Sequence, residues 1–373
     1  MPIQVQRLTS ALTAAGLLVE TRGTLPETVA SVVDDSRRVQ AGSLFIAVKG
    51  SERDGHDYPE AARGAGAGAP VVEIGGRTQL PAIVVRDGRR AAAVVAAAAF
   101  NNPVQSLRLI WVTGTNGKTP TVHMLRHLLD DDRAPAASIG TVGVLVGSAG
   151  RPHAEDTGLT TPGPVELQEL LRSLVDAGVR TVGMEVSSHP PLVERVEGVS
   201  FDVAVFTNLT RDHLDYHRTM AEYRAAKERL CQHLAPHGTI VVNLDDPAWR
   251  QMVVQRRKVT FSVRDPNAEV HSERMAYDSH GSRWTLFAGS ERREVRLPLI
   301  GDFNVANALG AAAAAYATGM SVDAIAAKLA SVPQVPGRLE VVLERPTVLR
   351  DYAHTPDALE RALHAVRPFT KGR

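Results

Sequence analysis

The segment of the chain best suited to chemistry is a short glycine-containing loop between an apolar stretch and a helical pattern. Residues 107–113 read Leu-Arg-Leu-Ile-Trp-Val-Thr, a run typical of a buried strand, and Lys118 and Thr119 begin the helical pattern. At such a helix N-terminus, backbone N–H groups, about half a positive charge from the helix dipole and a lysine ammonium together favour an anion. The Thr119 hydroxyl is placed to ligate Mg²⁺. We therefore predict a phosphate-binding loop made of Gly114, Thr115, Asn116, Gly117, Lys118 and Thr119.

This loop differs in two ways from the usual phosphate-binding pattern. That pattern has a glycine five residues before Gly117, where this chain has Val112, so the loop here is shorter. Pro120 lies in the first helical turn, where its missing N–H would have had no intrahelical partner. The alternative interpretation is a glycine turn beside a surface lysine. The order of strand, loop and helix favours phosphate binding, because each falls where that function needs it.

Three further positions carry groups that could act beside a bound phosphate. Glu185 follows an apolar run, so its carboxylate could hold Mg²⁺ next to a triphosphate, or it could be a solvated strand-end residue. His213 lies in the segment 206–217, which is dense in metal-capable side chains but lacks the Cys/His spacing of a zinc site. Lys227 lies on a helical pattern flanked by Arg and Glu, which by itself is typical of a surface charge.

These groups must be held by the middle one of three regions that the pattern of the chain separates. Residues 1–106 alternate short apolar runs with turns and close with a helix over 88–100, which Asn101-Asn-Pro103 ends. Residues 107–335 alternate strands with helices, which predicts a parallel sheet covered on both faces. The expected strands are 107–113, 181–186, 203–207 and 239–243, and the expected helices are 121–129, 164–177, 220–233 and 304–318.

Ligands of a parallel sheet bind at the carboxyl ends of its strands. The glycine loop, Glu185 and Asn208 all lie at such ends. Residues 336–373 hold two strand patterns, 339–343 and 347–351, and a helical pattern over 357–366. A fragment of this size cannot bury a core by itself, so its strands should present unpaired edges.

The composition describes an ordinary globular protein. A length of 373 residues predicts two or three domains. The 42 Lys and Arg residues nearly balance the 41 Asp and Glu residues, which argues against a general nucleic-acid or membrane-surface binder. Cys231 is the single cysteine, so no internal disulfide can form. No apolar run reaches the roughly 18 residues needed to span a bilayer, and we expect a cytoplasmic protein.

Taken in order along the chain, a series of short motifs resembles the Mur ligases, the ATP-dependent enzymes that form the amide bonds of peptidoglycan precursors. The motifs of the first region are Asp35-Ser-Arg37, Gly42–Gly50 and Asp54-Gly-His56. Those of the middle region are Gly114–Thr119, Thr160-Thr-Pro162, Glu185–His189, Thr207–His217 and Tyr223–Lys227. The last are Gly301–Asn307, Pro336-Gly-Arg338 and Asp351–Asp357. The first region looks most like that of the family member that adds the third residue of the peptide.

The resemblance implies an α/β fold with the three-domain Mur ligase architecture. Residues 1–106 would form a small α/β domain that binds the UDP substrate, and residues 107–335 a central P-loop parallel-sheet ATPase domain. Residues 336–373 would form the start of a Rossmann-like, amino-acid-binding C-terminal domain.

The resemblance also assigns roles to single residues. Lys227 matches a lysine that carries a carbamate in this family, and carbamylation turns a cation into an anion able to ligate Mg²⁺. Thr119, Glu185 and His213 match metal positions, where Mg²⁺ would neutralise the triphosphate, so Lys118, Lys227 and His213 are the expected catalytic residues. Further ATP contacts are expected from Asn304, Asn307, Arg338 and Asp351. Contacts to the muramoyl-peptide substrate are expected from Ser36, Thr160, Thr161, Ser187 and Arg195.

The implied reaction is the ATP-driven addition of a diamino acid to UDP-N-acetylmuramoyl-L-alanyl-D-glutamate through an acyl phosphate. Mg²⁺ is the implied cofactor, and we expect a cytoplasmic monomer without nucleic-acid or membrane partners. meso-Diaminopimelate is the commoner amine donor in the family and is favoured over L-lysine. Two alternatives are another ligase of the superfamily, such as folylpolyglutamate synthase, and a non-catalytic nucleotide-binding fragment. The uridine-type motifs of the first region argue against the folate enzyme.

Two departures from the family pattern bear on activity. Pro191 and Val193 stand where the family usually has Leu and Gln, which puts one substrate hydrogen bond in question. The family's third domain runs on for about a hundred residues more, a typical small-domain size, and the motif that reads the incoming amino acid is not among these 373 residues. We therefore expect the 373-residue chain to bind ATP and the UDP substrate but to form product very slowly or not at all.

Overall fold

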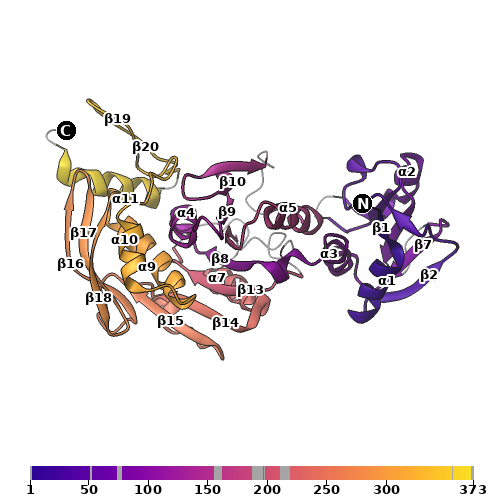
Figure 1. Ribbon diagram of the computed structural model, residues 1–373, viewed down its shortest axis with the longest axis horizontal. Helices are drawn as coiled ribbons and strands as arrows, with labels where there is room; N and C mark the ends of the chain where they lie inside the picture. The colour runs from indigo at the N-terminus through magenta and orange to yellow at the C-terminus, as the bar shows by residue number, and fades with distance from the viewer. Residues whose placement is uncertain are drawn as a thin grey trace. The chain divides into compact units, whose positions relative to one another are not determined.

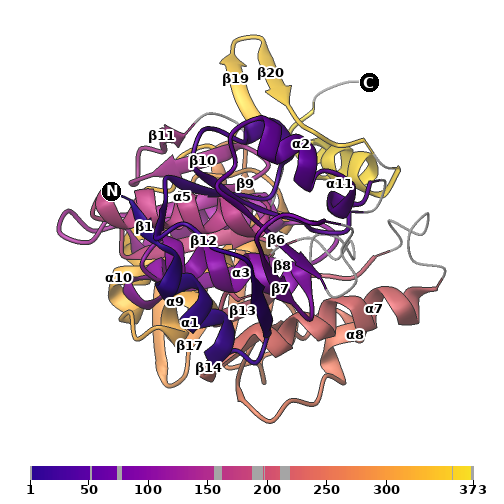
Figure 2. The same cartoon turned by 90° about the vertical axis from the view of Figure 1, so that its right-hand side faces the viewer.

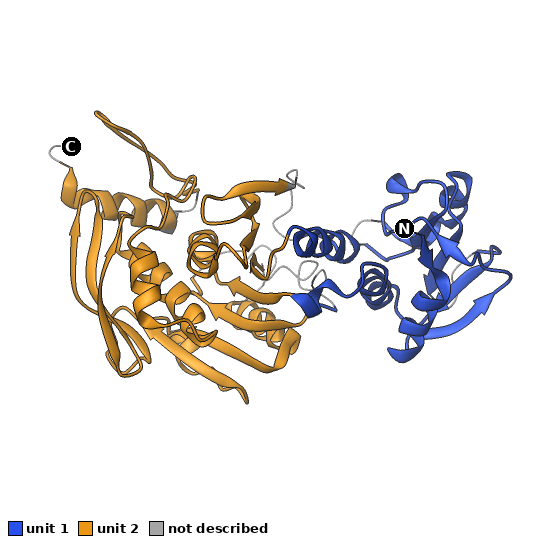
Figure 3. Ribbon diagram, in the orientation of Figure 1, with its two compact units in different colours: residues 1–106, 162–177, 190–199 blue, residues 107–161, 178–189, 200–373 orange. Residues whose placement is uncertain are grey.

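The structure, a computed structural model, describes residues 2–50, 53–73, 78–154, 162–186, 196, 198–210, 219–354 and 356–370. The chain forms two compact units (Figure 3). The first contains residues 1–106, 162–177 and 190–199, and the second contains residues 107–161, 178–189 and 200–373. No helix of the described part of the chain is long and apolar enough to cross a membrane.

The first unit is built on a five-stranded sheet. Its strand order is β2 (Leu18–Arg22), β7 (Ala82–Val85), β6 (Ala69–Glu73), β5 (Ser43–Ile46) and β4 (Ser31–Val33). All neighbours are parallel except β2 and β7. A separate ladder joins β1 (Ile3–Gln4) to β3 (Thr28–Val29). The helices are α1 (Val5–Ala14), α2 (Pro59–Gly64), α3 (Gly88–Ala99) and α5 (Pro164–Asp176), with short 3-10 turns η1 (Ser36–Arg38), η2 (Gly55–Asp57) and η3 (Pro103–Ser106).

Helix α3 holds the first unit together because its alanines allow close packing. It lies against both α1 and α5, and its buried face consists mainly of alanine. Asp87 directly precedes the helix, and its side chain accepts a hydrogen bond from the Arg90 N–H and so caps an otherwise unpaired donor. The core on this side of the sheet combines Leu8 and Leu12 of α1 with strand residues such as Leu44 and Ile83.

The second unit contains one eleven-stranded sheet, in the order β11-β10-β9-β12-β8-β13-β14-β15-β16-β17-β18. The strands are β8 (Arg108–Thr113), β9 (Ala136–Gly140), β10 (Gly143–Val146), β11 (Arg151–Ala154), β12 (Thr181–Glu185), β13 (Phe201–Phe206), β14 (Leu234–Asn243), β15 (Arg257–Ser262), β16 (Val270–Asp278), β17 (Gly281–Ala288) and β18 (Glu291–Leu297). The seven strands from β9 to β16 in this order are parallel, and antiparallel strands extend the sheet at both edges. A large, mainly parallel sheet confirms the predicted α/β class.

The chain reverses its direction of travel across this sheet at β8. From β8 it passes through α4 (Lys118–Leu129) to β9, returns to β12, and then crosses to β13 on the other side of β8. Such a reversal opens a crevice at the carboxyl ends of the strands, which is where open α/β sheets bind ligands. The carboxyl ends of β8, β12 and β13 are therefore the place to look for a site.

Helices cover the central strands closely. Helices α4, α9 (Asp302–Ala317) and α10 (Val322–Leu329) pack together over one face (Figure 1). Ile110 and Val112 of β8 belong to the core under them, while Trp111 packs edge-on against Phe201 with ring centroids 4.9 Å apart. Because both faces of β8 are buried, its sequence is apolar without alternation. The unit also contains α7 (Met220–Arg229), η5 (Leu230–His233) and α8 (Pro247–Arg250).

The last described residues form a small, open substructure. It consists of the two-stranded β19 (Glu340–Glu344) and β20 (Thr347–Arg350), then α11 (Pro356–Val366) and η6 (Arg367–Phe369). The hairpin extends from the rest of the second unit in both views (Figures 1 and 2). Among the described residues each of its strands pairs only with the other, as expected for unpaired edges, and Val342 and Leu343 are exposed. The boundaries predicted for three domains stay a prediction.

Candidate nucleotide-binding site

The glycine loop lies where the sequence predicts it, between the end of β8 at Thr113 and the start of α4 at Lys118. Gly117 has a left-handed backbone, with φ 82°, and precedes the first helical residue. A side chain is also excluded by contact: a Cβ at Gly117 would lie 2.3 Å from Asn307 Oδ1, and one at Gly114 would lie 1.9 Å from Thr207 Oγ1. The loop therefore needs both glycines for close approach as well as for backbone geometry.

Lys118 turns its side chain back over the loop. Its Nζ donates to the carbonyl oxygens of Gly114 and Thr115 at 2.9 and 2.8 Å. The first intrahelical bond of α4 runs from the Thr121 N–H to the Gly117 carbonyl, so the N–H groups before it belong to the open helix end. An ammonium group and a helix N-terminus thus converge on the same small volume, which suits an anion such as phosphate.

Residues 207–209 after β13, named here the bracket, hold the loop in shape. The Asn208 carbonyl accepts the Thr115 N–H at 2.8 Å. The Asn208 side chain contacts both backbone polar groups of Asn116: it accepts the Asn116 N–H at 2.9 Å and donates to the Asn116 carbonyl at 3.0 Å. Thr207 Oγ1 donates to that same carbonyl at 2.7 Å. The bracket therefore fixes which way two successive loop peptides point.

Lys227 lies in the site and not on the surface, so the interpretation from its local pattern is wrong. It comes from α7, is 1% exposed, and its Nζ donates to Thr113 Oγ1 and to the Gly114 carbonyl, each at 3.3 Å. The Tyr223 ring lies 4.7 Å from this ammonium, measured to the ring centroid. Burying an ammonium group is costly, which marks Lys227 as a functional candidate.

Glu185 ends β12, the strand beside β8, and pairs in register with Val112. It is 2% exposed, so it is not a solvated strand-end residue. Its two carboxylate oxygens accept the Thr141 N–H at 3.0 Å and the Thr141 hydroxyl at 3.2 Å. A Cβ at Gly140 would lie 2.1 Å from Glu185 Oε1, which explains the glycine there.

Arg338 lies at the start of the last substructure, and Asp351 bonds the residue that follows it. An Arg338 guanidinium nitrogen donates to Thr119 Oγ1 at 3.3 Å, and its Cζ lies 5.3 Å from the Tyr352 ring centroid. Asp351 accepts the Leu339 N–H at 2.7 Å and the Ala353 N–H at 2.8 Å. Asp351 thereby shapes the turn that carries Arg338 to the helix N-terminus.

Asn304 and Asn307 line one face of α9 beside the loop. Asn304 donates to the Ile300 carbonyl at 2.8 Å, and Asn307 donates to Asn304 Oδ1 at 3.2 Å. Both amides are buried, and Asn307 lies directly against Gly117. The pair is therefore oriented before any ligand binds.

His123 lies one turn after Thr119 on α4 and is buried. Burial, helped by the nearby charges of Arg126 and Arg338, lowers the pKa of His123 to about 3. The imidazole is therefore neutral at neutral pH, and the positive charge near the loop comes from lysine and arginine.

The remaining predicted residues fall elsewhere. Ser36 lies in the first unit, in η1, whose first turn is capped by Asp35 accepting the Arg37 N–H at 2.9 Å. Its neighbour Arg37 lowers the pKa of the Asp35 carboxyl through their hydrogen bonds. Five predicted residues lie outside the described residues: Thr160, Thr161, Ser187, Arg195 and His213.

The donors present suit a hard cation. Glu185 ends β12, and Thr119 lies in the first turn of α4, which follows the neighbouring strand β8. Both side chains supply oxygen atoms, and Mg²⁺ prefers oxygen ligands. Within the described ranges no cluster of three or more His, Cys, Asp or Glu side chains is poised to hold a metal. The chemistry of these two donors thus fits Mg²⁺ held jointly with phosphate oxygens.

Sequence reasoning missed the residues that support the site. Thr207 and Thr141 contact the loop and Glu185 directly, and Asn208, predicted only to lie at a strand end, is the central residue of the bracket. The available signal was polar side chains directly after buried strands, since such positions line the crevice.

The sequence matches two known protein domains. Residues 112–315 match the Mur ligase middle domain, and residues 28–109 match the catalytic domain of the Mur ligase family. Over 347 residues the chain is 43% identical to the UDP-N-acetylmuramoyl-L-alanyl-D-glutamate–2,6-diaminopimelate ligase of Geobacillus kaustophilus (strain HTA426). That alignment covers 90% of this chain and 70% of the relative.

Solved structures of Mur ligases and related enzymes have a similar fold. A structure of a UDP-N-acetylmuramoyl-L-alanyl-D-glutamate–2,6-diaminopimelate ligase is similar with a TM-score of 0.79 and 28% identity, over 98% of this chain and 74% of that one. Folylpolyglutamate synthase of Mycobacterium tuberculosis, complexed with ADP and AMPPCP, is similar with a TM-score of 0.63 and 19% identity, over 74% of this chain and 70% of that one. At 19% identity the second likeness concerns the fold alone. Together these likenesses confirm the predicted α/β architecture and the resemblance of the motifs.

Proposed function

Because the chain belongs to the Mur ligase family, we propose that it adds meso-diaminopimelate to UDP-N-acetylmuramoyl-L-alanyl-D-glutamate with consumption of ATP. The observation that carries this proposal is the phosphate loop, where Lys118 and α4 converge on one volume beside the buried Glu185. The relative that is 43% identical is named as the ligase for 2,6-diaminopimelate, which favours that amine over L-lysine. Such a reaction belongs to peptidoglycan precursor synthesis, and we propose a monomer that works in the cytoplasm.

The reaction proceeds in two displacements. An oxygen of the D-glutamate carboxylate attacks the γ-phosphorus of ATP, the bond to the ADP oxygen breaks, and an acyl phosphate forms. The amine then attacks the acyl carbon, the carbon–oxygen bond to phosphate breaks, and the amine loses a proton. Phosphoryl transfer needs little covalent help from a protein, so positioning and charge stabilisation are its main contributions.

The residues in and around the loop have separate roles in this reaction. The Lys118 ammonium and the helix N-terminus bind the phosphate oxygens, and Arg338 adds a second positive charge at Thr119. Asn304 and Asn307 offer oriented amides to the adenine edge, and Asp351 holds the turn of Arg338. Bound Mg²⁺, held by Glu185, Thr119 and His213, would further neutralise the triphosphate.

We propose that Lys227 carries a carbamate in place of its ammonium charge. Lys118 and Lys227 both donate to the Gly114 carbonyl, so their two ammonium groups lie no more than about 6 Å apart. Two cations at that distance in a buried site repel each other. Carbon dioxide adding to the Lys227 amine, with loss of a proton, would replace the repulsion by attraction and supply oxygen atoms for Mg²⁺.

The muramoyl-peptide substrate is proposed to contact Ser36 in the first unit and Thr160, Thr161, Ser187 and Arg195. These assignments come from the family motifs that the residues match. Pro191 and Val193 stand where the family usually has Leu and Gln, and Val193 has no polar side-chain group, which puts one hydrogen bond to the peptide in question.

The test is ADP release in a substrate panel, measured on a longer chain that carries a complete third domain beside the 373 residues, which alone are expected to form product very slowly or not at all. We expect release that requires UDP-N-acetylmuramoyl-L-alanyl-D-glutamate and is stimulated more by meso-diaminopimelate than by L-lysine. Release driven by a folate and glutamate would instead favour the folylpolyglutamate synthase alternative. Binding of MgATP without product, by the 373 residues and by a longer chain alike, would favour the non-catalytic alternative.

A further inference from the structure

The bracket of residues 207–209 is itself held by two side chains that do not belong to the phosphate loop. The Asn243 side chain, at the end of β14, donates to the Thr207 carbonyl at 2.7 Å. Three residues later, Asp246 Oδ2 accepts the Leu209 N–H at 2.7 Å. Both bonds are buried, and they fix the two ends of the bracket on either side of Asn208.

Asp246 is in turn fixed by its place at the start of α8. Its Oδ1 accepts the Ala248 N–H at 2.9 Å, so the carboxylate caps the short helix with one oxygen and holds the bracket with the other. Its carbonyl accepts the N–H groups of Trp249 and Arg250, each at 3.1 Å. A buried Trp249 anchors this turn, with its ring 5.0 Å from that of Phe206. The support for the bracket is therefore rigid.

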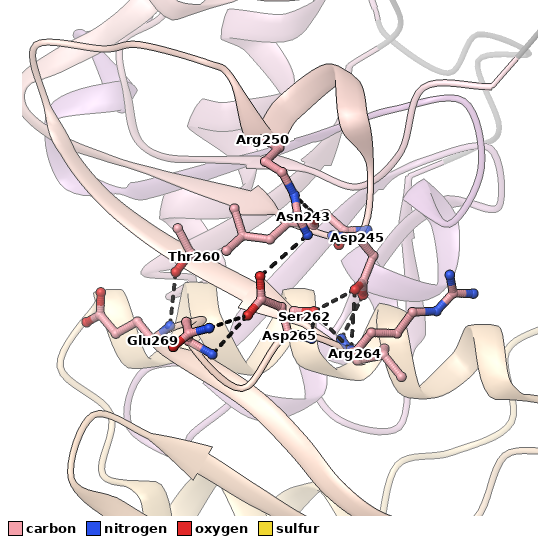
Figure 4. A network of polar contacts seen from close by, with 11 residues as sticks. Asn243, Asp245, Arg250, Thr260, Ser262, Arg264, Asp265 and Glu269 are labelled. Atoms are coloured by element: carbon pink, nitrogen blue, oxygen red, sulfur yellow. Dashed lines mark hydrogen bonds and ion pairs between the residues drawn. The ribbon is translucent and has the colours of Figure 1, made fainter.

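The neighbouring carboxylate, Asp245, faces the other way. It accepts the Ser262 hydroxyl at 2.5 Å and the Val263 N–H at 2.7 Å, and so joins the end of β14 to the end of β15 (Figure 4). Two adjacent aspartates thus support different neighbours: Asp246 supports the loop side and Asp245 supports the side away from it. This pair provides a control inside the molecule.

We propose that Asp246, together with Asn243, is a positioning residue for nucleotide binding. It acts through the bracket, because Asn208 can bond both the N–H and the carbonyl of Asn116 only while Thr207 and Leu209 stay in place. The expected effect falls on ATP and not on the UDP substrate. This inference rests on the proposed function in one respect, namely that the loop 114–119 binds the phosphates of ATP.

The experiment compares Asp246→Asn with Asp245→Asn in the whole protein. An asparagine at 246 has a single side-chain oxygen, so it can accept only one of the two N–H groups, those of Leu209 and Ala248. Its amide hydrogens would face the other N–H group. We expect MgATP binding, measured by calorimetry, to weaken about tenfold in Asp246→Asn, as for the loss of one charge-assisted hydrogen bond. We expect the affinity for the UDP substrate, also measured by calorimetry, to stay within about twofold, and Asp245→Asn to leave ATP affinity unchanged even where it lowers the melting temperature.

A second variant, Asn243→Ser, tests the same inference if Asp246→Asn does not fold. Asn243→Ser removes the donor to the Thr207 carbonyl and should also weaken MgATP binding while sparing the UDP substrate. Amide exchange at Thr115 and Asn116 should be faster in both bracket variants, because their acceptors lie on Asn208. Wild-type ATP affinity in folded Asp246→Asn or Asn243→Ser, or equal weakening by Asp245→Asn, would overturn the inference. Absence of MgATP binding by the unmodified protein would instead overturn the proposed function.

Discussion

Replacing Gly117 by alanine tests the geometry of the phosphate loop most sharply. The residue has φ 82°, and an added Cβ would lie 2.3 Å from Asn307 Oδ1, a separation that real Cβ atoms essentially never show. Gly178 offers a matched control, because it has φ 86° and no atom within 4 Å of the position that a Cβ would take. Gly117→Ala and Gly178→Ala therefore share the backbone cost and differ only in the contact.

The magnitudes follow from these contacts. A left-handed backbone costs a non-glycine residue roughly 1–2 kcal/mol, and both variants should lose about that much stability. In Gly117→Ala the Asn307 amide must also move, which breaks its hydrogen bond to Asn304, worth roughly 0.5–1.5 kcal/mol. We expect a total loss of roughly 1.5–3.5 kcal/mol for Gly117→Ala, with ATP affinity at least about tenfold lower because the loop and the adenine-side amide both shift.

The assay combines denaturant unfolding with MgATP calorimetry on both variants. The expected result is a stability loss in both, greater for Gly117→Ala, and weakened ATP binding in that variant alone. Unchanged ATP affinity in Gly117→Ala would refute the contact between the loop and α9. An equal loss of affinity in Gly178→Ala would show that general destabilisation, and not the loop, controls binding.

Three other side chains around the loop give separate tests. Lys118→Ala should cost about 1.5–3 kcal/mol of MgATP binding in calorimetry, since it removes one charge-assisted phosphate contact, and unaltered binding would refute the loop assignment. Lys227→Ala should lose turnover and regain part of it with added short carboxylic acids, and absence of rescue in a folded variant would count against the carbamate. The pKa of His123 is about 3 when folded, below its unfolded value, so its neutral form contributes stability that is full above about pH 6.5 and falls as the pH falls toward 3. Between pH 8 and pH 5 the free energy of unfolding of His123→Gln should therefore fall by about 2 kcal/mol less than that of the unmodified protein. An unchanged pH profile in unfolding experiments would contradict this.

The elements around the loop were predictable because their signals are local. The run 107–113 is β8 apart from its first residue, and the predicted helices 164–177 and 304–318 match α5 and α9 within two residues at each end. The strands from β15 to β18 were not predicted. In β17 the buried Trp284 and Leu286 do alternate with other residues, but β18 reads Glu-Arg-Arg-Glu-Val-Arg-Leu, and so many charges hide the strand period.

Local sequence patterns did not predict that Lys227 and Glu185 are buried. Lys227 has charged neighbours on a helix, and nothing within one turn indicates that α7 carries it against Gly114, more than a hundred residues earlier. Glu185 is similar, since its burial depends on Thr141 from another strand connection. Burial of a charged group is a property of tertiary packing, and here only the resemblance to a family supplied it.

The bracket shows the same limit for uncharged groups. Asn208 and Asn116 are 92 residues apart, and each by itself is an ordinary loop asparagine. Their pairing follows from the order of strands β8, β13 and β14, which a single sequence does not determine. Spacing thus predicts which residues reach the crevice, and the topology decides which of them meet.

The acyl phosphate is the central claim about the chemistry, and isotope transfer tests it most directly. The purified protein, as the longer chain with a complete third domain, would be given ATP, meso-diaminopimelate and UDP-N-acetylmuramoyl-L-alanyl-D-glutamate with ¹⁸O in the D-glutamate carboxylate. Because that carboxylate oxygen becomes the bridge to phosphorus and leaves with it, each phosphate released with tripeptide should carry one ¹⁸O atom. Tripeptide formed with unlabelled phosphate, or with AMP in place of ADP, would contradict the account.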